Sequence, residues 1–590
     1  MSQVGNLAAW LLDGALASGA GGRCALREGE RAWTYDELAA TVARVSSALR
    51  GMRLGRGERV LVLMRDTLEA AASILGVVHA GAVAVPVSEL ATPDDLREYV
   101  LHAGAVIAMV DDAHERVVDA IRAATPDLRE VIGVGAKLAG SHDFHALVSA
   151  AAPQPPVAMG PSDVCLLIYS AGSGPGELRA VPHCQRTISA AHDSFARELL
   201  QLSSADRMLS IARLSTAYGL GSGLLLPLAV QAESLLFPAQ PTSKALFKAV
   251  ESYRPTVLVA TPSVYAQLAH DAERLGATRP LVDLRHAVAG AEGMPERLIP
   301  RIRAVLGTEV TVGYGLTEIF QFALAGRSSD PGARPGVCGK PLAGVQVRLV
   351  DEDGDPVGVD EIGTLELMCG SLFAGYWGGG ATGELGGDGW FTTRDRFMVD
   401  RAGFYHHCGR VDDLFKVGGK WVSPVEVERA LTAHEAVGGR GDRRGRRGGP
   451  DQAARVRGHQ RRPRGRAGAR GRAQGLRQER ARAVQVPAVD RVRRRAAARA
   501  GRQDAALQAA AGARQAPPRR DRHAAQRVID ARPRPGACDF GLPRPRGMNM
   551  MSVICRAPRE ASRPRPTSGS WTPRRASSAS TATPARPSPT

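Results

Sequence analysis

Short apolar runs alternate with longer amphipathic segments along residues 1–437. The segment TYDELAATVARVSSALRGM (34–52) has the length and the apolar spacing of a helix with one buried face. The apolar runs are nearly continuous, a pattern typical of strands that are buried on both faces of a parallel sheet. Four of these runs are RVLVLM (59–64), AVIAMV (105–110), VCLLIY (164–169) and TVLVATP (256–262). The alternation of strand and helix patterns predicts a layered α/β fold.

The pattern changes from about Gly344 onward to short strands separated by turns, as in VQVRLVDEDGDPV and GTLELMCG. This region predicts a smaller, mostly β subdomain. Beyond Val437 the chain is rich in Arg, Ala, Gly and Pro and has almost no apolar periodicity. Because such a composition cannot bury a core, we expect this tail to be disordered.

The charge of the chain is divided unevenly between its two parts. A formal net charge of +18 and a pI of about 10.1 would suggest an anionic partner if the charge were spread evenly. Residues 438–590 hold 38 arginines, no lysine and nine acidic residues, a net charge of +29, which leaves −11 for residues 1–437. The body of the protein is therefore mildly acidic.

Arginine without lysine, in an Ala-, Gly- and Pro-rich tail, is what GC-rich coding DNA gives when it is read out of register. Reading each codon from its second base makes VQVPAVDRVRRRAA (484–497) compatible with F-K-x-P-R-W-I-E-F-V-D-E-L-P. In that register, Arg502 followed by Gln503 can encode Gly-Lys. We interpret the tail as the product of a frameshift near residues 437–441. The alternative is a basic arm that binds nucleic acid, but such arms usually mix lysines with their arginines.

The eight cysteines show no CxxC pair and no spacing typical of a metal site, so we expect reduced thiols. The amino terminus has no basic segment followed by an apolar one, and no run of about 20 apolar residues occurs. These features favour a cytoplasmic protein with no membrane partner.

Two stretches have the residue types of a nucleotide site. YSAGSGPGELRAVPH (169–183) is a Ser/Gly-rich turn after an apolar run, and its N–H groups could approach phosphate oxygens closely. In GYGLTE (313–318), Tyr314 could stack on a base, Thr317 could donate to a phosphate and Glu318 could bind Mg²⁺. The plain alternatives are a flexible turn and a strand end with a solvated glutamate.

Two further stretches lie toward the end of the body. DGWFTTRD (388–395) ends in Asp395, whose carboxylate could accept both hydroxyls of a ribose. GRVDDLFKVGGKWVSPVEVE (409–428) combines an arginine, two adjacent aspartates and a glycine pair, at the junction between two sequence textures. This combination is typical of a hinge.

In this order, the four stretches resemble the AMP-forming acyl-CoA synthetase and adenylation-domain superfamily, over about residues 5–437. Three more stretches resemble benzoate-CoA ligases and related aryl-acid ligases: LSTAYGLGSGLLLPLAVQAESLLF (214–237), RPTVLVATPSVYAQL (254–268) and AVAGAEGMPERL (287–298). The resemblance implies a large adenylate-forming domain (1–408), built of layered α/β subdomains and a β subdomain. A hinge and the start of a small C-terminal domain (409–437) would follow, and the out-of-frame tail (438–590) would leave that domain truncated or scrambled.

The resemblance also implies a role for each matching residue. The ATP phosphates would lie on the loop residues Ser170, Gly172, Ser173, Gly174 and Arg179. The adenosine part would contact Gly290, Ala291, Glu292, Tyr314, Gly315, Asp395 and Arg410, the last two at the ribose. Arg179, Thr317 and Glu318 would act on the reacting phosphates, with Mg²⁺ on Glu318.

Other matching residues would serve the acid and the thiol. The acid would lie against Ala217, Tyr218, Gly219 and Gln321. Asp412 would be the hinge of the small domain, and Lys416, Gly418 and Gly419 would line the pantetheine tunnel of coenzyme A.

Four departures from the family pattern bear on activity. Arg179 stands where the phosphate loop usually has lysine, in a loop one residue longer, and its planar guanidinium is not equivalent to an ammonium. Arg394 replaces the glycine before the ribose aspartate. Gln321 stands where aryl ligases often have histidine, which indicates a substituted or differently polar ring unless Gln321 only packs. The C-terminal catalytic lysine is absent from the chain as written.

We therefore expect ATP-dependent activation of a benzoate-like acid, with Mg²⁺ and coenzyme A. The carboxylate would attack the α-phosphorus, pyrophosphate would leave, and the thiol would then displace AMP. The alternatives are loading of the aryl acid onto a carrier protein and an inactive frameshifted relative that only binds its ligands. A homodimer is left open.

Overall fold

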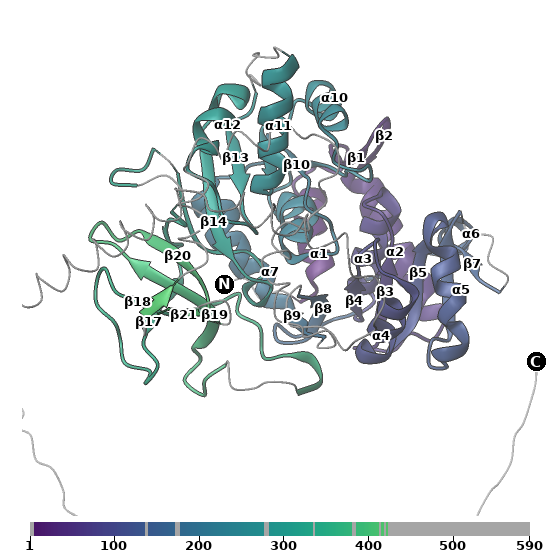
Figure 1. Cartoon of the computed structure of the whole chain (residues 1–590). Coiled ribbons are helices and arrows are strands. Elements are labelled where there is room, and N and C mark those ends of the chain that lie inside the picture. Colours follow the sequence, from purple (N-terminus) through teal and green to yellow (C-terminus); the bar gives the residue numbers. More distant parts are fainter. Residues whose placement is uncertain are drawn as a thin grey trace, which may run out of the picture. The chain divides into compact units, whose positions relative to one another are not determined.

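The computed structural model describes residues 5–135, 140–170, 178–275, 283–327, 329–333, 337–379, 385–411, 415–417 and 420–422. Within these ranges the chain forms two large sheets, a small antiparallel sheet and a short hairpin (Figure 1). Several predictions fall outside the described residues: those for Gly172, Ser173, Gly174, Asp412, Gly418, Gly419 and the tail 438–590.

The first large sheet has seven strands in the order β7-β6-β5-β3-β4-β8-β9. All neighbours pair in parallel except β8 and β9, which are antiparallel. In β3, Val60 and Val62 face one buried cluster while Leu61 and Leu63 face another, which explains the continuous apolar run. The strands are β3 (Arg59–Leu63), β4 (Val83–Pro86), β5 (Ala105–Asp111), β6 (Glu130–Val134), β7 (His142–Asp143), β8 (Val164–Tyr169) and β9 (Ala180–Cys184).

The second large sheet has nine strands in the order β16-β15-β14-β13-β12-β10-β11-β1-β2, with a parallel centre and antiparallel strands at its two ends. The predicted run at 256–262 is shorter as a strand, because Pro262 begins helix α11 (Pro262–Leu275) directly after it. The strands are β1 (Cys24–Glu28), β2 (Arg31–Thr34), β10 (Arg207–Ser210), β11 (Glu233–Leu235), β12 (Val257–Ala260), β13 (His286–Ala289), β14 (Val310–Gly315), β15 (Phe322–Arg327) and β16 (Lys340–Pro341).

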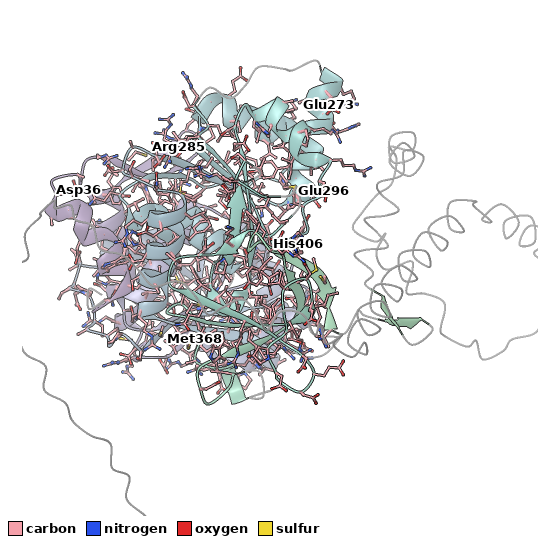
Figure 2. All side chains as sticks on the ribbon, turned by 90° about the vertical axis from the view of Figure 1, so that its left-hand side faces the viewer. Asp36, Glu273, Arg285, Glu296, Met368 and His406 are labelled. Atoms are coloured by element: carbon pink, nitrogen blue, oxygen red, sulfur yellow. The ribbon has the colours of Figure 1, made fainter. Side chains whose placement is uncertain are left out.

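Helices separate the two large sheets and cover their outer faces, which confirms the predicted layered α/β fold (Figure 1). Side chains fill the space between the layers (Figure 2). The inner layer is built from α1 (Leu7–Ala17), α2 (Tyr35–Gly51), α3 (Leu68–His79), α8 (Ala217–Leu220), η4 (Gly221–Leu225) and α9 (Leu226–Ala229). The outer helices are α4 (Pro93–Ala103) and α5 (Glu115–Ile121) on the seven-stranded sheet, and α10 (Ser243–Tyr253), α11 and α12 (Leu298–Leu306) on the nine-stranded sheet.

The helix predicted over 34–52 is α2, and its start follows from its own sequence. The Thr34 hydroxyl accepts the N–H of Glu37 while the Glu37 carboxylate accepts the N–H of Thr34, so each side chain satisfies an amide at the helix end. Shorter helical segments complete the described part: η1 (Asp112–His114), η2 (Arg122–Ala124), α6 (Phe144–Ala150), α7 (Gln185–Ala191), η3 (His192–Leu199) and η6 (Trp377–Gly379). Among the described residues, no helix is both long enough and apolar enough to cross a membrane.

The predicted β subdomain is a four-stranded antiparallel sheet that begins where the sequence pattern changes. Its buried face packs on Ile319 and Leu324, close to the end of β14. Strand β20 runs on to Arg410, so the domain boundary expected at 408 remains a prediction. The strands are β17 (Val345–Val350), β18 (Ile362–Cys369), β19 (Phe391–Val399) and β20 (Tyr405–Arg410), and the separate hairpin is β21 (Phe415–Val417) with β22 (Lys420–Val422).

One charged cluster joins the carboxyl ends of strands from both large sheets. Arg213, which follows β10, lies 3.6 Å from Oδ2 of Asp66 and 3.0 Å from Oε1 of Glu89, which follow β3 and β4. The other oxygen of Asp66 accepts the N–H of Leu214 at 3.1 Å. Burial raises the pKa of Asp66 to about 6, although the Arg213 charge and the Leu214 hydrogen bond oppose the shift.

This raised pKa makes the stability of the fold depend on pH at one position. An aspartate that titrates at about 6 when folded and near 3.8 when unfolded binds more protons in the folded state between those two pH values. We expect the free energy of unfolding of the wild type to gain about 1 kcal/mol relative to Asp66→Asn between pH 7.5 and pH 5. Chemical denaturation of both proteins at the two pH values measures this difference, and a difference independent of pH would contradict the prediction.

Candidate active site

A cleft of about 1690 Å³ opens at the carboxyl ends of β8, β10, β12, β13 and β14 and continues to strands β19 and β20. In an open α/β sheet, ligands bind at this edge of the strands. Most of the described residues that the sequence singled out line the cleft: Ser170, Arg179, Ala217, Tyr218, Ala291, Glu292, Tyr314, Gly315, Thr317, Glu318, Gln321, Asp395 and Arg410.

At one end of the cleft, an aromatic ring and a carboxylate are held together. The Tyr314 hydroxyl donates to Oδ2 of Asp395 at 2.7 Å, and Nε2 of His407 lies 3.1 Å from Oδ1. Arg410 lies opposite Asp395 in the β19–β20 pairing. Burial alone would raise the pKa of Asp395, but the bonds from His407 and Tyr314 and the charge of Arg410 hold it below its usual range. The carboxylate is therefore ionised at neutral pH and accepts hydrogen bonds.

At another part of the cleft, one tyrosine contacts both a carboxylate and a guanidinium. The Tyr376 hydroxyl donates to Oε1 of Glu318 at 2.7 Å, and the Arg179 guanidinium carbon lies 5.3 Å from the centre of the Tyr376 ring. Glu318 is only 7% exposed, in the turn η5 (Thr317–Ile319). The N–H of Ser170 donates to the Arg179 carbonyl at 2.9 Å, so the segment between β8 and β9 starts and ends on paired strands.

The strip after β13 brings Ala291 and Glu292 to the cleft. The Glu292 carboxylate accepts the backbone N–H and the hydroxyl of Ser263, in the first turn of α11. Its neighbour Ala291 has a φ of 66°. The carboxylate of Glu292 therefore caps a helix.

The floor of the cleft is formed by close packing around Phe322. A Cβ atom at Gly313 would lie 2.0 Å from the Phe322 ring, and one at Gly290 would lie 2.5 Å from it. The Tyr218 ring stacks on the same phenyl ring, with centroids 5.4 Å apart and planes at 25°. Only glycines at these two positions allow the phenyl ring to lie against β13 and β14.

Two further glycines on the predicted site have packing roles. A Cβ at Gly219 would lie 2.1 Å from the Arg213 carbonyl oxygen, and Gly219 is not among the residues that line the cleft. A Cβ at Gly315 would lie 2.2 Å from the carbonyl oxygen of Gln321. The side chain of Gln321 is 3% exposed, and its Nε2 donates to the Ala217 carbonyl at 3.5 Å.

Sequence reasoning missed Tyr376 and His407. Both contact predicted residues from distant parts of the chain, so no local spacing connects them to the site. The only signals were aromatic and imidazole side chains in AGYWG and FYHHCGR, beside the predicted strands.

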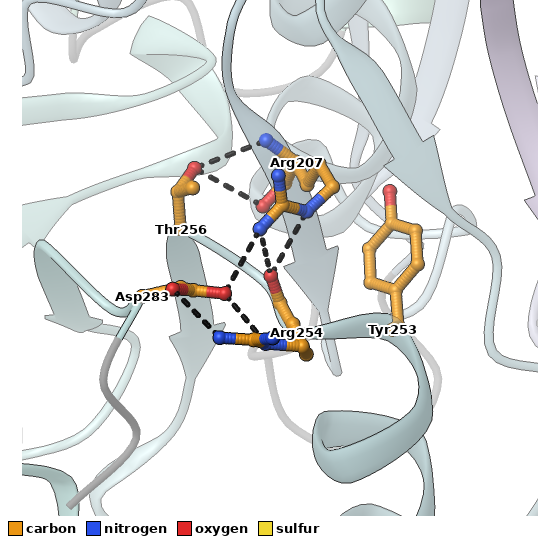
Figure 3. Close-up of a pocket in the computed structure, with 5 residues that line it drawn as sticks. All are labelled: Arg207, Tyr253, Arg254, Thr256 and Asp283. Carbon is orange, nitrogen blue, oxygen red and sulfur yellow. Dashed lines mark hydrogen bonds and ion pairs between the residues drawn. The ribbon is translucent and has the colours of Figure 1, made fainter.

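A second hollow, of about 570 Å³, lies at the amino ends of β10 and β12 (Figure 3). The carboxylate of Asp283 pairs with Arg207 at 3.3 Å and with Arg254 at 2.7 Å, and Arg207 also donates to the Arg254 carbonyl. These three charged side chains pair with one another, whereas most of the described residues that the sequence singled out line the larger cleft.

Comparison with known proteins identifies the family. The model of the AMP-binding enzyme family matches residues 15–377, which include the glycine-rich turn, the GYGLTE stretch and Tyr376. The chain belongs to this family. Strands β19 and β20, which carry Asp395, His407 and Arg410, lie beyond the part of this AMP-binding enzyme that the family model matches.

The relatives of this AMP-binding enzyme include benzoate–CoA ligase of Thauera aromatica, 32% identical over 73% of this chain and 81% of the relative. The 3-hydroxybenzoate–CoA ligase of Aromatoleum sp. (strain CIB) is 33% identical over 72% of this chain and 82% of the relative. A crystal structure of an anthranilate CoA ligase in complex with anthranoyl-AMP superposes with a TM-score of 0.68, at 28% identity over 73% of this chain and 83% of that chain.

The packing around Phe322 is tested by Gly313→Ala. The added methyl group would overlap the phenyl ring, and overpacking of this kind typically costs about 1–3 kcal/mol. We expect a lower free energy of unfolding in chemical denaturation and weaker binding of nucleotide. Gly22→Ala is the matched control, because nothing lies within 4 Å of its added atom. Equal stability of the two variants would contradict the prediction, because it would show that the Phe322 ring can move away from the added methyl group at little cost.

Proposed function

We propose that this AMP-binding enzyme is an AMP-forming ligase that activates an aromatic carboxylic acid with ATP and transfers it to coenzyme A. The observation that carries the proposal is the pair of groups on one cleft: Tyr314 with Asp395, and Glu318 with Arg179. The first suits a nucleoside and the second suits a triphosphate. The relatives named as benzoate–CoA and 3-hydroxybenzoate–CoA ligases support an aromatic acid as substrate.

We assign the nucleoside to the first group by its chemistry. An ionised Asp395 can accept both ribose hydroxyls, and Arg410 beside it can donate to the ribose. Adenine would lie between the Tyr314 ring and the backbone of Ala291 and Glu292. Because Tyr314 donates to Asp395, the ring and the carboxylate keep a fixed relation before ATP arrives.

The triphosphate would lie between Ser170, Arg179 and Glu318, with Thr317 at the α-phosphate. A buried carboxylate that faces the cleft fits Mg²⁺, which prefers hard oxygen ligands, so Glu318 would hold the ion. When bound, Mg²⁺ would neutralise charge on the phosphates. Arg179 would donate to the phosphate oxygens, and Tyr376 would position both side chains.

In the first half-reaction, a carboxylate oxygen of the acid bonds to the α-phosphorus while the bond from that phosphorus to the bridging oxygen breaks. Pyrophosphate leaves with the bonding electrons, and an acyl-adenylate remains. In the second half-reaction, the thiolate sulfur of coenzyme A bonds to the acyl carbon. The bond between that carbon and the phosphate oxygen breaks, and AMP leaves with the bonding electrons. The described residues supply orientation and charge complementarity, with the acid against Ala217 and Tyr218.

The small C-terminal domain is proposed to be encoded in the gene but lost from this chain. The hinge Asp412, the tunnel residues Lys416, Gly418 and Gly419, and the Gly-Lys encoded behind Arg502 and Gln503 would belong to it. Coenzyme A is the proposed acceptor, and a phosphopantetheinyl carrier protein is the alternative that the same chemistry allows.

The role of Glu318 is tested by Glu318→Gln, which keeps the shape and removes the charge. We expect ATP–pyrophosphate exchange with benzoate to fall at least about 100-fold, the size typical of losing one preorganised electrostatic contact. Glu273→Gln is the control, since Glu273 lies on α11 (Figure 2), is not part of the cleft lining and pairs with Arg301. Undiminished exchange in Glu318→Gln would remove this residue from the proposed mechanism.

The interpretation of the tail is tested by the nucleotide sequence around codons 435–445 and by a chain with the frame restored. We expect the restored chain to form aryl thioester at least about 100-fold faster than the chain as written, because it regains the catalytic lysine. Coenzyme A and a carrier protein are compared as acceptors in that assay. If the restored chain is no faster, Arg179 and the longer phosphate loop would limit turnover instead.

A further inference from the structure

The side-chain oxygen of Gln321 is a buried acceptor on the lining of the cleft. The residue is 3% exposed, and its Oε1 has no hydrogen-bond partner among the residues that the structure describes. Leaving an acceptor of this kind unsatisfied costs about 1–3 kcal/mol. A buried polar atom without a partner, in a cleft built for ligands, calls for a donor from the ligand.

The orientation of the amide follows from its neighbours. Nε2 faces the carbonyl oxygen of Ala217 at 3.5 Å, and only the nitrogen of the amide can donate to that oxygen. A Cβ atom at Gly221 would lie 1.8 Å from the same nitrogen and 3.0 Å from the Phe320 ring. The amide is therefore enclosed on its nitrogen side, and its oxygen is the atom that stays without a partner.

The nearby hydroxyl groups already donate elsewhere. The Tyr218 hydroxyl donates to the Val288 carbonyl at 3.4 Å, and the Ser222 hydroxyl donates to the Tyr218 carbonyl at 2.5 Å. Neither of them reaches Gln321. Since no described residue donates to Oε1, a molecule bound in the cleft can supply the donor.

We propose that Gln321 selects an aromatic acid that carries a hydroxyl or amino group on its ring. Such a group donates to Oε1 of Gln321, whereas an unsubstituted or methyl-substituted ring leaves the oxygen buried and unsatisfied. The inference rests on the proposed function, because it places the aromatic acid against Ala217 and Tyr218, next to Gln321. Gln321 is thus a specificity residue, and the ring donor is the feature that it recognises.

Calorimetric titration of the full chain, in the presence of AMP, tests the selection. The probes are benzoate and its hydroxyl, amino and methyl derivatives at each ring position, since a methyl group matches the donors in size and cannot donate. At one position, we expect the hydroxyl or amino acid to bind at least about tenfold more tightly than the methyl acid, a difference of about 1.4 kcal/mol. Equal binding of the methyl and donor acids at every position would overturn the inference.

Gln321→Met keeps the length of the side chain and removes the amide oxygen. We expect this variant to lose the preference for the donor acid, and its melting temperature reports whether it folds. Gln154→Met is the matched control, because Gln154 is exposed and is not part of the cleft lining. If Gln321→Met still prefers the hydroxyl or amino acid over the methyl acid, another residue makes the selection and the inference is wrong. If no aromatic acid binds or supports ATP–pyrophosphate exchange, the proposed function itself fails. If aromatic acids bind but donor and methyl acids bind equally, only the role of Gln321 fails.

Discussion

The contact of the Phe322 ring with two glycines is the constraint on which the cleft depends. The ring occupies the space where Gly290 and Gly313 have no side chains, and Tyr218 stacks on it from the inner helical layer. Strands β13, β14 and β15 and helix α8 are thereby held at one spacing. That spacing sets the distance across the cleft between Tyr314, at the end of β14, and Ala217 and Tyr218, in α8. Close-packed interiors transmit such constraints because they deform little.

The layers of the fold could be predicted from the sequence, because strands buried on both faces leave continuous apolar runs and α2 carries its own capping residues. The sequence assigned the motif residues to one nucleotide site through the family resemblance, and those among them that the structure describes meet at a cleft because their segments follow the carboxyl ends of parallel strands. The contacts of Tyr376 with Glu318 and Arg179 could not be predicted, since they join segments 58 and 197 residues apart in sequence. The helix-capping role of Glu292 depends on the register between two strands, which no local pattern encodes.

Local surroundings set the charge of the buried aspartates Asp395 and Asp66. Asp395, on the lining of the cleft, is stabilised as an anion by two hydrogen bonds, whereas Asp66, outside that lining, is stabilised in its neutral form by burial. Two aspartates of one molecule therefore differ in charge over the same pH range because of their surroundings alone.

The hydrogen bond between Ser170 and Arg179 holds together the two ends of the segment that joins β8 to β9. A chain segment with anchored ends can gain or lose a residue at small entropic cost, because closure entropy grows only slowly with length. The paired ends therefore allow the length of this segment to change at little entropic cost to strands β8 and β9. For protein engineering, the consequence is that Ser170 and Arg179 mark the two natural joints at which a segment of another length would be inserted.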